Sequence, residues 1–387
     1  MKKKVSSIVD SIFEELKDLN QYIFENPELG FDEHKSSKAH VELLKKKGFE
    51  VTENFLGFDT GFKAEYDSGK EGPVIAYMAE YDALPDIGHG CGHNILGTAS
   101  TGSGIVLKEI VEELGGKVVV MGTPAEETSG AKVEYVNKGA FDDVDIALMA
   151  HPADDHYESG SSLALEAIRF TFRGQTAHAA AAPTEGINAL DACINTFNNI
   201  NALREHIRPD ARVHGVITEG GKAANIVPDL AIADFYVRAT TKAYLEELRE
   251  KVKNCARGAA LAAGAEIEIE NYEASYDNMV TNRRLQDIYN QKLYGYSEIK
   301  IKRAKESYGS LDAGNVSHVC PTIHPYFKIS NEKVVGHTRE FASASVGQTA
   351  LNEMKNTIGA LVLTAVEVIE NEDLLAEIKK EFENTPK

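Results

Sequence analysis

The sequence predicts an α/β fold built on a mainly parallel sheet, with a smaller antiparallel α+β domain inserted into it. In residues 74–152, short apolar runs alternate with helical patterns, which is typical of a parallel sheet covered by helices on both faces. From residue 164 the order becomes strand, helix, strand, strand, helix, strand, which fits an antiparallel sheet with two helices on one face. We therefore expect a main domain of residues 1–163 and 277–387 and an inserted domain of residues 164–276.

The elements of the main domain follow from hydrophobic spacing. Apolar residues from Val5 to Ile23 recur at helical intervals, and Gly48 ends a second amphipathic helix. The expected strands are the apolar runs at residues 74–81, 117–122 and 144–149. The expected helices are residues 5–24, 36–47, 95–114, 131–138 and a long helical region at 346–381.

The inserted domain shows the period of two that half-exposed strands have. Residues 164–172 and 266–270 alternate apolar and polar side chains. The expected strands of this domain are residues 164–172, 212–217, 226–238 and 266–270, and its expected helices are residues 188–203 and 243–263.

Composition excludes several classes of partner. The net charge of −19 disfavours nucleic acid and anionic membrane surfaces. The basic start is interrupted by acidic residues from Asp10 onward, and no apolar run is long enough to span a membrane. The four cysteines are widely scattered, which is not the spacing of a disulfide scaffold. We therefore expect a cytoplasmic protein with reduced thiols and without a membrane or nucleic-acid partner.

The loop Gly88-His-Gly-Cys-Gly-His93 is the first candidate site. It follows the strand at 74–81, and its three glycines leave room for Cys91 and His93 to face one ion. A thiolate and an imidazole are ligands that zinc prefers. A single Cys-x-His is as often a packing feature, so the neighbouring strand ends decide between the two interpretations.

Polar residues follow each of the three predicted strands of the main domain. Open α/β sheets bind ligands at the carboxyl ends of their strands, so we expect these side chains to share one edge of the sheet. Either His324 or His337, later in the chain, could complete the group of metal ligands. The residues that follow the strands are Asp82, Cys91, His93, Glu126, Glu127 and His151.

Two adjacent carboxylates suggest the chemistry. Glu126 and Glu127 point in different directions after a strand, so one can bind metal while the other acts as a general base on water. No Gly-x-Ser-x-Gly is present, which argues against an α/β-hydrolase serine. A Cys91 thiol nucleophile remains an alternative, although His93 is too close in sequence to be an obvious base.

Taken together, the motifs resemble the M20 metallopeptidase and amidohydrolase family, over nearly the whole chain and in the same order. The cysteine-containing loop places the resemblance in subfamily D, nearest the aminobenzoyl-glutamate hydrolase, β-alanyl-lysine dipeptidase and HmrA-type amidohydrolase members. The motifs are Asp82-Ala-Leu-Pro85, Gly90-Cys-Gly-His93, Pro124-Ala-Glu-Glu127, His151-Pro152, Gly174-Gln-Thr-Ala-His178 and Gly336-His-Thr338.

The resemblance implies a zinc-peptidase-like catalytic domain with a two-metal centre and an inserted, ferredoxin-like dimerisation or lid domain. Glu126 would be the general base, and Asp82 would orient a ligand from behind. Zinc is the expected metal, with manganese, cobalt or nickel also compatible. The implied metal ligands are Cys91 in place of the wider family's bridging Asp, His93, Glu127, His151 and His337.

In the inserted domain the resemblance implies that His178 enters a partner subunit's site and stabilises the oxyanion, which requires a homodimer or a higher homo-oligomer. Asn225 and Arg238 would bind a substrate carboxylate. We favour His337 over His324 as the last ligand because Gly-His-Thr fits the ligand motif better, and His324 is then expected to contact substrate.

The sequence departs from the family pattern at two places. The wider family's His-x-Asp reads Glu80-Tyr-Asp82 here, so a ligand from the first strand is missing and the Cys91 loop must replace it. Leu311-Asp312-Ala313 stands where the subfamily usually has Glu-Asp-Phe, which changes one pocket wall.

These features predict a metal-dependent hydrolase that cleaves an amide bond in a small N-acyl amino acid or dipeptide with metal-activated water. The alternative is a non-catalytic protein of the same fold that binds metal or an amino-acid derivative. An intact Glu126 argues against that alternative, because a binding protein has no use for a free carboxylate beside the water. Chelation would distinguish the Cys91 thiol mechanism from the metal-dependent one, because thiol-dependent activity would survive removal of the metal.

Overall fold

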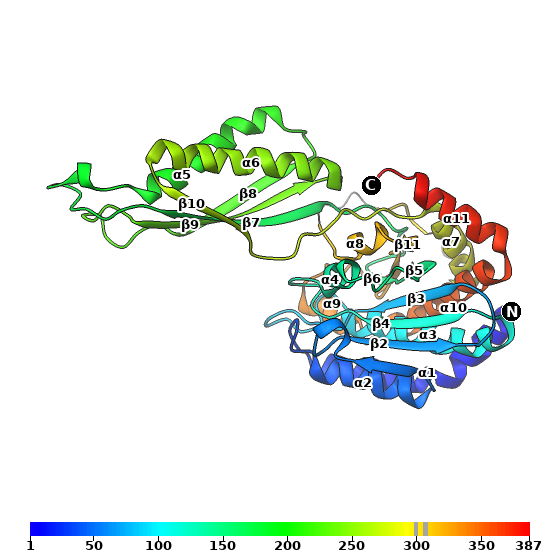
Figure 1. Ribbon diagram of the computed structural model, residues 1–387. Helices are drawn as coiled ribbons and strands as arrows, with labels where there is room; N and C mark the ends of the chain where they lie inside the picture. Colours follow the sequence, from blue (N-terminus) through cyan, green and yellow to red (C-terminus); the bar gives the residue numbers. More distant parts are fainter. Residues whose placement is uncertain (298–300, 305–308) are drawn as a thin grey trace. The chain divides into compact units, whose positions relative to one another are not determined.

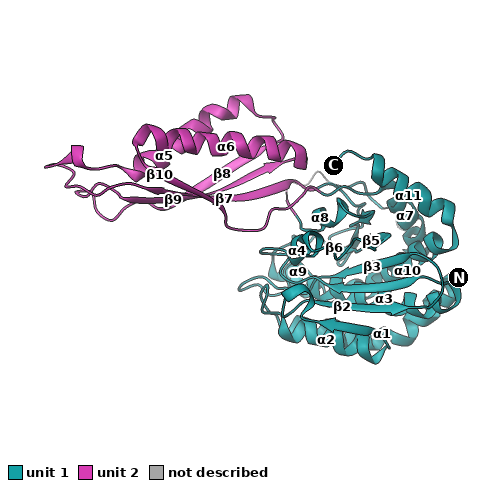
Figure 2. Ribbon diagram, in the orientation of Figure 1, with its two compact units in different colours: residues 1–161, 279–307, 311–386 teal, residues 162–278, 308–310, 387 magenta. Residues whose placement is uncertain are grey.

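The computed structural model describes residues 1–297, 301–304 and 309–387. The chain divides into two compact units (Figure 2). Unit 1 comprises the described residues of Met1–Ser161, Met279–Ser307 and Leu311–Pro386, and unit 2 those of Ser162–Asn278, Tyr308–Ser310 and Lys387.

Unit 1 is built on a mixed sheet with the order β1-β2-β4-β3-β5-β11. Strand β3 pairs in parallel with β4 and β5, and β5 pairs in parallel with β11, whereas β1 and β2 add an antiparallel edge. The predicted mainly parallel sheet is therefore present. Its strands are β1 (Glu50–Glu53), β2 (Phe62–Asp67), β3 (Val74–Ala79), β4 (Lys117–Gly122), β5 (Ile146–Leu148) and β11 (Thr322–Ile323).

Helices cover both faces of this sheet because the central strands are apolar on both faces (Figure 1). Along β3, Tyr77 packs in the large core with helices α1, α3 and α10, while Met78 packs on the opposite face with α4 and α8. The helices of unit 1 are α1 (Lys2–Glu25), α2 (His34–Lys46), α3 (His93–Leu114), α4 (Ala131–Asn137), α7 (Arg283–Ser297), α8 (Ala313–Ser317), α9 (Arg339–Ala344), α10 (Gln348–Glu370) and α11 (Glu372–Asn384).

Several features of unit 1 differ from the sequence-based expectation, which also lacked strand β11 and helices α7, α8 and α9. Strands β1 and β2 were not predicted, and β1 is only four residues long and mostly exposed. The expected helical region at 346–381 is two helices, because Asn371 leaves helical geometry and its side chain accepts the backbone N–H of Leu374 to begin α11. A short parallel pair, β6 (His151–Ala153) with β12 (Tyr326–Lys328), lies outside the main sheet.

Unit 2 is an antiparallel sheet with the order β10-β7-β9-β8 and its own core. Alternate residues of β9 are buried, so one face of the sheet packs on helices α5 and α6, as the sequence pattern predicted. The elements are β7 (Ala164–Arg173), α5 (Ala189–Leu203), β8 (Arg212–Glu219), β9 (Leu230–Ala239), α6 (Lys242–Ala263) and β10 (Glu266–Asn271). Single-turn 3-10 helices occur at Phe55–Gly57 in unit 1 and at Pro183–Glu185 and Arg204–His206 in unit 2.

The third strand of unit 2 begins later than expected. Residues 226–238 were predicted as a strand, but β9 starts at Leu230. Pro228 has no N–H for a strand ladder, and Val227 instead donates its N–H to the carbonyl of Ala177 at 3.0 Å. Among the described residues, no helix is long and apolar enough to cross a membrane.

Candidate metal centre

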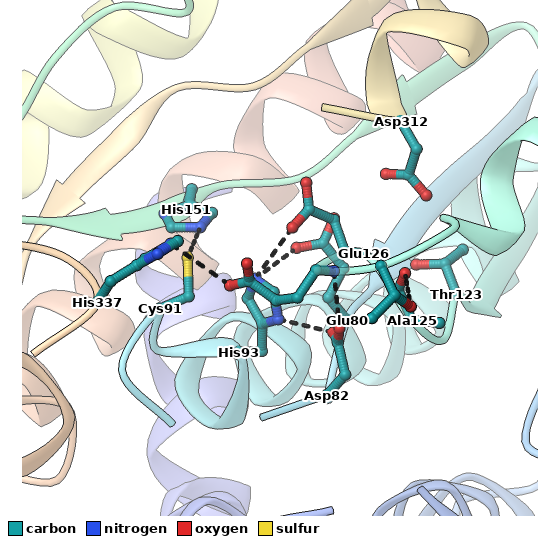
Figure 3. A network of polar contacts seen from close by, with 12 residues as sticks. Glu80, Asp82, Cys91, His93, Thr123, Ala125, Glu126, His151, Asp312 and His337 are labelled. Carbon is teal, nitrogen blue, oxygen red and sulfur yellow. Dashed lines mark hydrogen bonds and ion pairs between the residues drawn. The ribbon is translucent and has the colours of Figure 1, made fainter. Parts of the chain in front are cut away.

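The loop after β3 brings a cysteine and a histidine to the end of the sheet. Gly92 precedes α3 with φ +77°, and a Cβ there would lie 2.6 Å from Cγ of Pro152. Glycine is therefore required both for the turn and for the close approach. As a result, His93 begins α3 fully buried and Cys91 lies beside it, half-buried (Figure 3).

Asp82 joins two strand ends through its two carboxylate oxygens. Its Oδ1 accepts a hydrogen bond from Nδ1 of His93 at 2.8 Å, and its Oδ2 accepts the backbone N–H of Glu127 at 2.9 Å. Because Nδ1 carries the donated proton, a neutral His93 has its lone pair on Nε2, the nitrogen that faces the other candidate ligands.

The turn after β4 presents Glu126 and Glu127. Ala125, just before them, has φ +64°, a conformation that a non-glycine residue adopts only when its surroundings hold it there. Glu33 provides that hold, because its Oε1 accepts the N–H of Ala125 at 2.7 Å while its Oε2 accepts a hydrogen bond from Oγ1 of Thr60 at 2.9 Å. Sequence reasoning did not identify Glu33, whose carboxyl side chain is completely buried.

His151 approaches the thiol from the next strand end. Its Nε2 lies 3.5 Å from Sγ of Cys91, and its Nδ1 donates to the carbonyl of Pro152 at 2.7 Å. Burial, together with the neighbouring His324 and His93, lowers the pKa of His151 to about 3. The imidazole is therefore neutral at physiological pH, with Nε2 available as a metal ligand.

His337 reaches the same place from a loop near the end of the chain. Its backbone N–H donates to the carbonyl of Gly90 at 2.8 Å, which ties this loop to the one that carries Cys91. Its Nε2 lies 3.7 Å from Oε1 of Glu127, although the side chain is 59% exposed. His324, by contrast, lies against the rings of His151 and Tyr326, at centroid distances of 5.5 and 5.1 Å.

The potential ligand atoms converge. In each of three groups of described residues, one ligand atom per residue lies within 4.8 Å of the others. His324 belongs to none of these groups. The groups are Cys91, His93 and His151; Cys91, Glu127 and His337; and His93, Glu126 and Glu127.

The donor set fits a divalent cation. Oε2 of Glu80, Nε2 of His93 and Oε1 of Glu127 are buried acceptors without a hydrogen-bond partner. Acceptors in such a place need a cation, because burying them unpaired is costly. Without metal, a proton on His93 supplies the positive charge. Burial alone would lower the pKa of His93, but Asp82 and Cys91 raise it well above the usual value. Thiolate, imidazole and carboxylate together suit zinc.

Glu126 lies beside these ligands in a strongly anionic environment. Burial first, and then the charges of Glu80 and Asp312, raise its pKa well above the usual value. Its Oε2 is 3.9 Å from Nε2 of His93. A carboxylate with a raised pKa beside a metal site has the properties of a general base.

A buried ion-pair group lies behind the site, and its lysine was not predicted. Nζ of Lys132 is 2.7 Å from Oε1 of Glu80 and 2.7 Å from Oδ1 of Asp312, and all three side chains are buried. Burial alone would lower the pKa of Lys132, but the two carboxylates raise it, so the side chain is a cation. No sequence pattern indicated this role, since lysines are almost never fully buried.

The other predicted site residues lie in unit 2. The backbone places His178 and Asn225 together, since Ala179 donates its N–H to the carbonyl of Asn225 at 3.0 Å. Arg238 lies near the opposite end of β9 from Asn225, and its Nη1 donates to Oγ of Ser310 at 3.2 Å. Nδ1 of His178 accepts hydrogen bonds from the backbone N–H groups of Ala180 and Ala181. The proton of the neutral imidazole is therefore on Nε2.

The chain is similar to known proteins along its whole length. A family model described as "Peptidase dimerisation domain" matches residues 165–263. The Xaa-Arg dipeptidase of Mus musculus is 35% identical over 400 residues, covering 99% of this chain and 92% of that protein. One of the subunits of the p-aminobenzoyl-glutamate hydrolase of Escherichia coli is 35% identical over 297 residues, covering 71% of this chain and 61% of that protein.

A solved structure has a similar fold. It is a Bacillus subtilis protein described as a dinuclear metal binding peptidase from the M20 family, and it aligns with a TM-score of 0.69. The alignment covers 92% of this chain and 99% of that one at 20% identity, which establishes likeness of fold.

Proposed function

Because this chain belongs to the M20 family of metallopeptidases and amidohydrolases, we propose that the residues around His93 form a two-metal centre that hydrolyses dipeptides. The resemblance found in the sequence is thereby confirmed, and the chain is an amide-bond hydrolase. One observation gives the main support for the proposed metal centre. Buried acceptor atoms of Glu80, His93 and Glu127 lie without donors beside the carboxylate of Glu126.

The proposed ligands come from four separate segments of unit 1. They are Cys91, His93, Glu127, His151 and His337, with zinc as the expected metal and manganese, cobalt or nickel as compatible substitutes. The three groups of converging ligand atoms support this set. When bound, the ions supply Lewis acidity, which makes water more acidic and polarises the carbonyl of the amide.

Glu126 is the proposed general base. It accepts a proton from the attacking water and returns that proton to the nitrogen of the leaving amine when the carbon–nitrogen bond breaks. Its raised pKa supports both transfers, because the carboxyl group holds the proton between them. Asp82 does not react in this scheme and instead orients His93.

His178 is proposed to stabilise the oxyanion. Its side chain is exposed, and its tautomer leaves the Nε2–H group free to donate. We propose that residues 164–276 form an inserted dimerisation domain, that the protein is a homodimer, and that His178 acts in the partner subunit's site. Asn225 and Arg238 are proposed to bind the substrate carboxylate from different subunits, since they lie near opposite ends of β9, with the guanidinium of Arg238 suited to a bidentate contact.

The substrate is proposed to be a dipeptide with a basic carboxy-terminal residue. The relative matched over 99% of the chain is named for Xaa-Arg dipeptides, and a net charge of −19 attracts cationic molecules. His324, which lies beside His151, is proposed to contact the substrate. We propose a cytoplasmic location, which the four free cysteines support.

The test is hydrolysis of Ala-Arg, Ala-Lys, Ala-Glu, N-acetyl amino acids and p-aminobenzoyl-glutamate, with total metal analysis. Wild type, Glu126→Gln and the exposed control Glu134→Gln are compared. We expect wild type and Glu134→Gln to cleave Ala-Arg fastest and to lose activity in EDTA. Glu126→Gln should keep its metal and lose about 10²- to 10⁴-fold in kcat.

The other outcomes identify the alternatives. Fastest cleavage of p-aminobenzoyl-glutamate would replace the proposed substrate and leave the metal centre intact. Metal binding without cleavage of any panel member would support a non-catalytic binding protein. Activity that survives EDTA would support Cys91 as a nucleophile and contradict the metal centre.

A further inference from the structure

A buried lysine contacts a carboxylate beside the proposed metal centre. Glu80 follows β3, Lys132 lies in the first turn of α4 and Asp312 precedes α8, so the group joins three separate segments. Nζ of Lys132 lies 2.7 Å from Oε1 of Glu80. The other oxygen, Oε2, is buried without a hydrogen-bond partner.

That second oxygen faces His93. Oε2 of Glu80 lies 3.3 Å from Nε2 of His93, and both atoms are buried without a hydrogen-bond partner. Since Nδ1 of His93 donates to Asp82, Nε2 of the neutral ring is an acceptor as well. Two buried acceptors at this distance repel each other unless a cation binds both.

The spacing fits a metal ion. Two ligand atoms that lie 2.0–2.1 Å from a tetrahedral zinc ion are about 3.3 Å apart. The 3.3 Å separation between Oε2 of Glu80 and Nε2 of His93 equals this distance. The side chain of Glu80 is only 2% exposed, so leaving Oε2 without a cation would be costly.

We propose that Oε2 of Glu80 binds the same metal ion as Nε2 of His93, and that Lys132 is the positioning residue that fixes this carboxylate. The inference rests on the metal centre proposed above and adds a ligand to it. The Asp312–Lys132 contact holds the ammonium group from behind, so that Lys132 neutralises one oxygen of Glu80 and leaves the other for the metal.

The experiment measures zinc affinity by competition with a chromogenic chelator, and the visible spectrum of the cobalt-substituted protein. Glu80→Gln is suitable because Lys132 and Asp312 still pair and the carbonyl of the introduced glutamine still accepts from Lys132. Glu126→Gln is the matched control, because it makes the same substitution near His93 without removing a proposed ligand. Lys132→Met and the double variant Glu80→Gln/Lys132→Met complete the set.

If Glu80 is a ligand, Glu80→Gln weakens binding of one ion at least about tenfold and shifts the cobalt bands, while Glu126→Gln does neither. Lys132→Met has a smaller effect on affinity, and the double variant binds no more weakly than Glu80→Gln alone. Wild-type affinity in Glu80→Gln, with only its thermal stability reduced, would show a purely structural ion pair and overturn the inference.

A second measurement does not depend on variants. Anomalous scattering from zinc-loaded wild-type crystals locates the ions directly, and an oxygen of Glu80 at about 2.0–2.2 Å from zinc supports the inference. Two bound ions that both lie well beyond this bonding distance from Glu80 would overturn this inference and leave the proposed function standing. A wild-type protein that binds no metal would overturn both.

Discussion

Asp82 and His93 are joined by a 2.8 Å hydrogen bond from Nδ1 to Oδ1, while the other oxygen of Asp82 accepts the backbone N–H of Glu127. One carboxylate thus holds candidate ligands from two strand ends. Asp82 is fully buried, so no solvent competes for these two hydrogen bonds.

The first prediction concerns Asp82→Asn. An asparagine has one acceptor oxygen, so it cannot accept from both His93 and Glu127 in the same way. We expect metal affinity to fall about 10- to 100-fold, as measured by chelator competition. The exposed Asp59→Asn serves as the control and should bind metal as wild type does. Unchanged affinity in Asp82→Asn would remove Asp82 from its orienting role.

The second prediction separates the two late histidines. His337 is largely exposed, so His337→Ala should fold normally but bind one ion instead of two, by metal analysis of the purified protein. His324 is buried beside His151 and Tyr326, so His324→Ala should keep both ions and raise KM. Loss of metal in His324→Ala and its retention in His337→Ala would reverse the assignment.

The third prediction concerns the thiol. A serine hydroxyl does not ionise as a thiolate does, so Cys91→Ser should lower zinc affinity at least about tenfold and lose activity that added zinc partly restores. Cys255→Ser, which removes another half-buried thiol, is the control and should behave as wild type. Failure of any zinc concentration to restore activity, with metal affinity unchanged, would favour the nucleophile alternative.

The fourth prediction is a pH dependence of stability that arises at Glu33. Burial, and then the charge of Asp82, raises the pKa of Glu33 from 4.5 to about 7. Between these values the folded state binds more protons than the unfolded state, so the free energy of unfolding falls as the pH rises. The stabilisation is complete below pH 4.5 and is lost as the pH rises through about 7.

Glu33→Gln removes this titration and keeps an acceptor for the N–H of Ala125. We expect the Tm of the variant to increase relative to that of wild type as the pH rises from about 5 to about 8. The corresponding difference in the free energy of unfolding is on the order of 3 kcal/mol at most. The exposed Glu14→Gln should follow wild type at every pH. Parallel pH profiles for wild type and Glu33→Gln would show that the Glu33 pKa does not control stability.

Much of the fold could be predicted because its signals are local. The apolar run of β3 and the alternating burial of β9 are properties of short segments, and both strands were found. The antiparallel edge strand β1 was missed because its four residues are mostly exposed and give no apolar pattern. The break at Asn371 was missed because the hydrophobic spacing continues across it, and only the backbone turn and the cap separate α10 from α11.

The residue types that stand at the strand ends could be read from the amino-acid order alone: Cys91, His93 and the Glu126–Glu127 pair. Their shared location followed because parallel strands end at one edge of a sheet. Which atoms face one another depended instead on tertiary packing. Lys132 meets Asp312 across 180 residues of chain, and the same ammonium group contacts Glu80, which lies beside His93. No local pattern encodes such a contact, because it depends on where three separate segments pack.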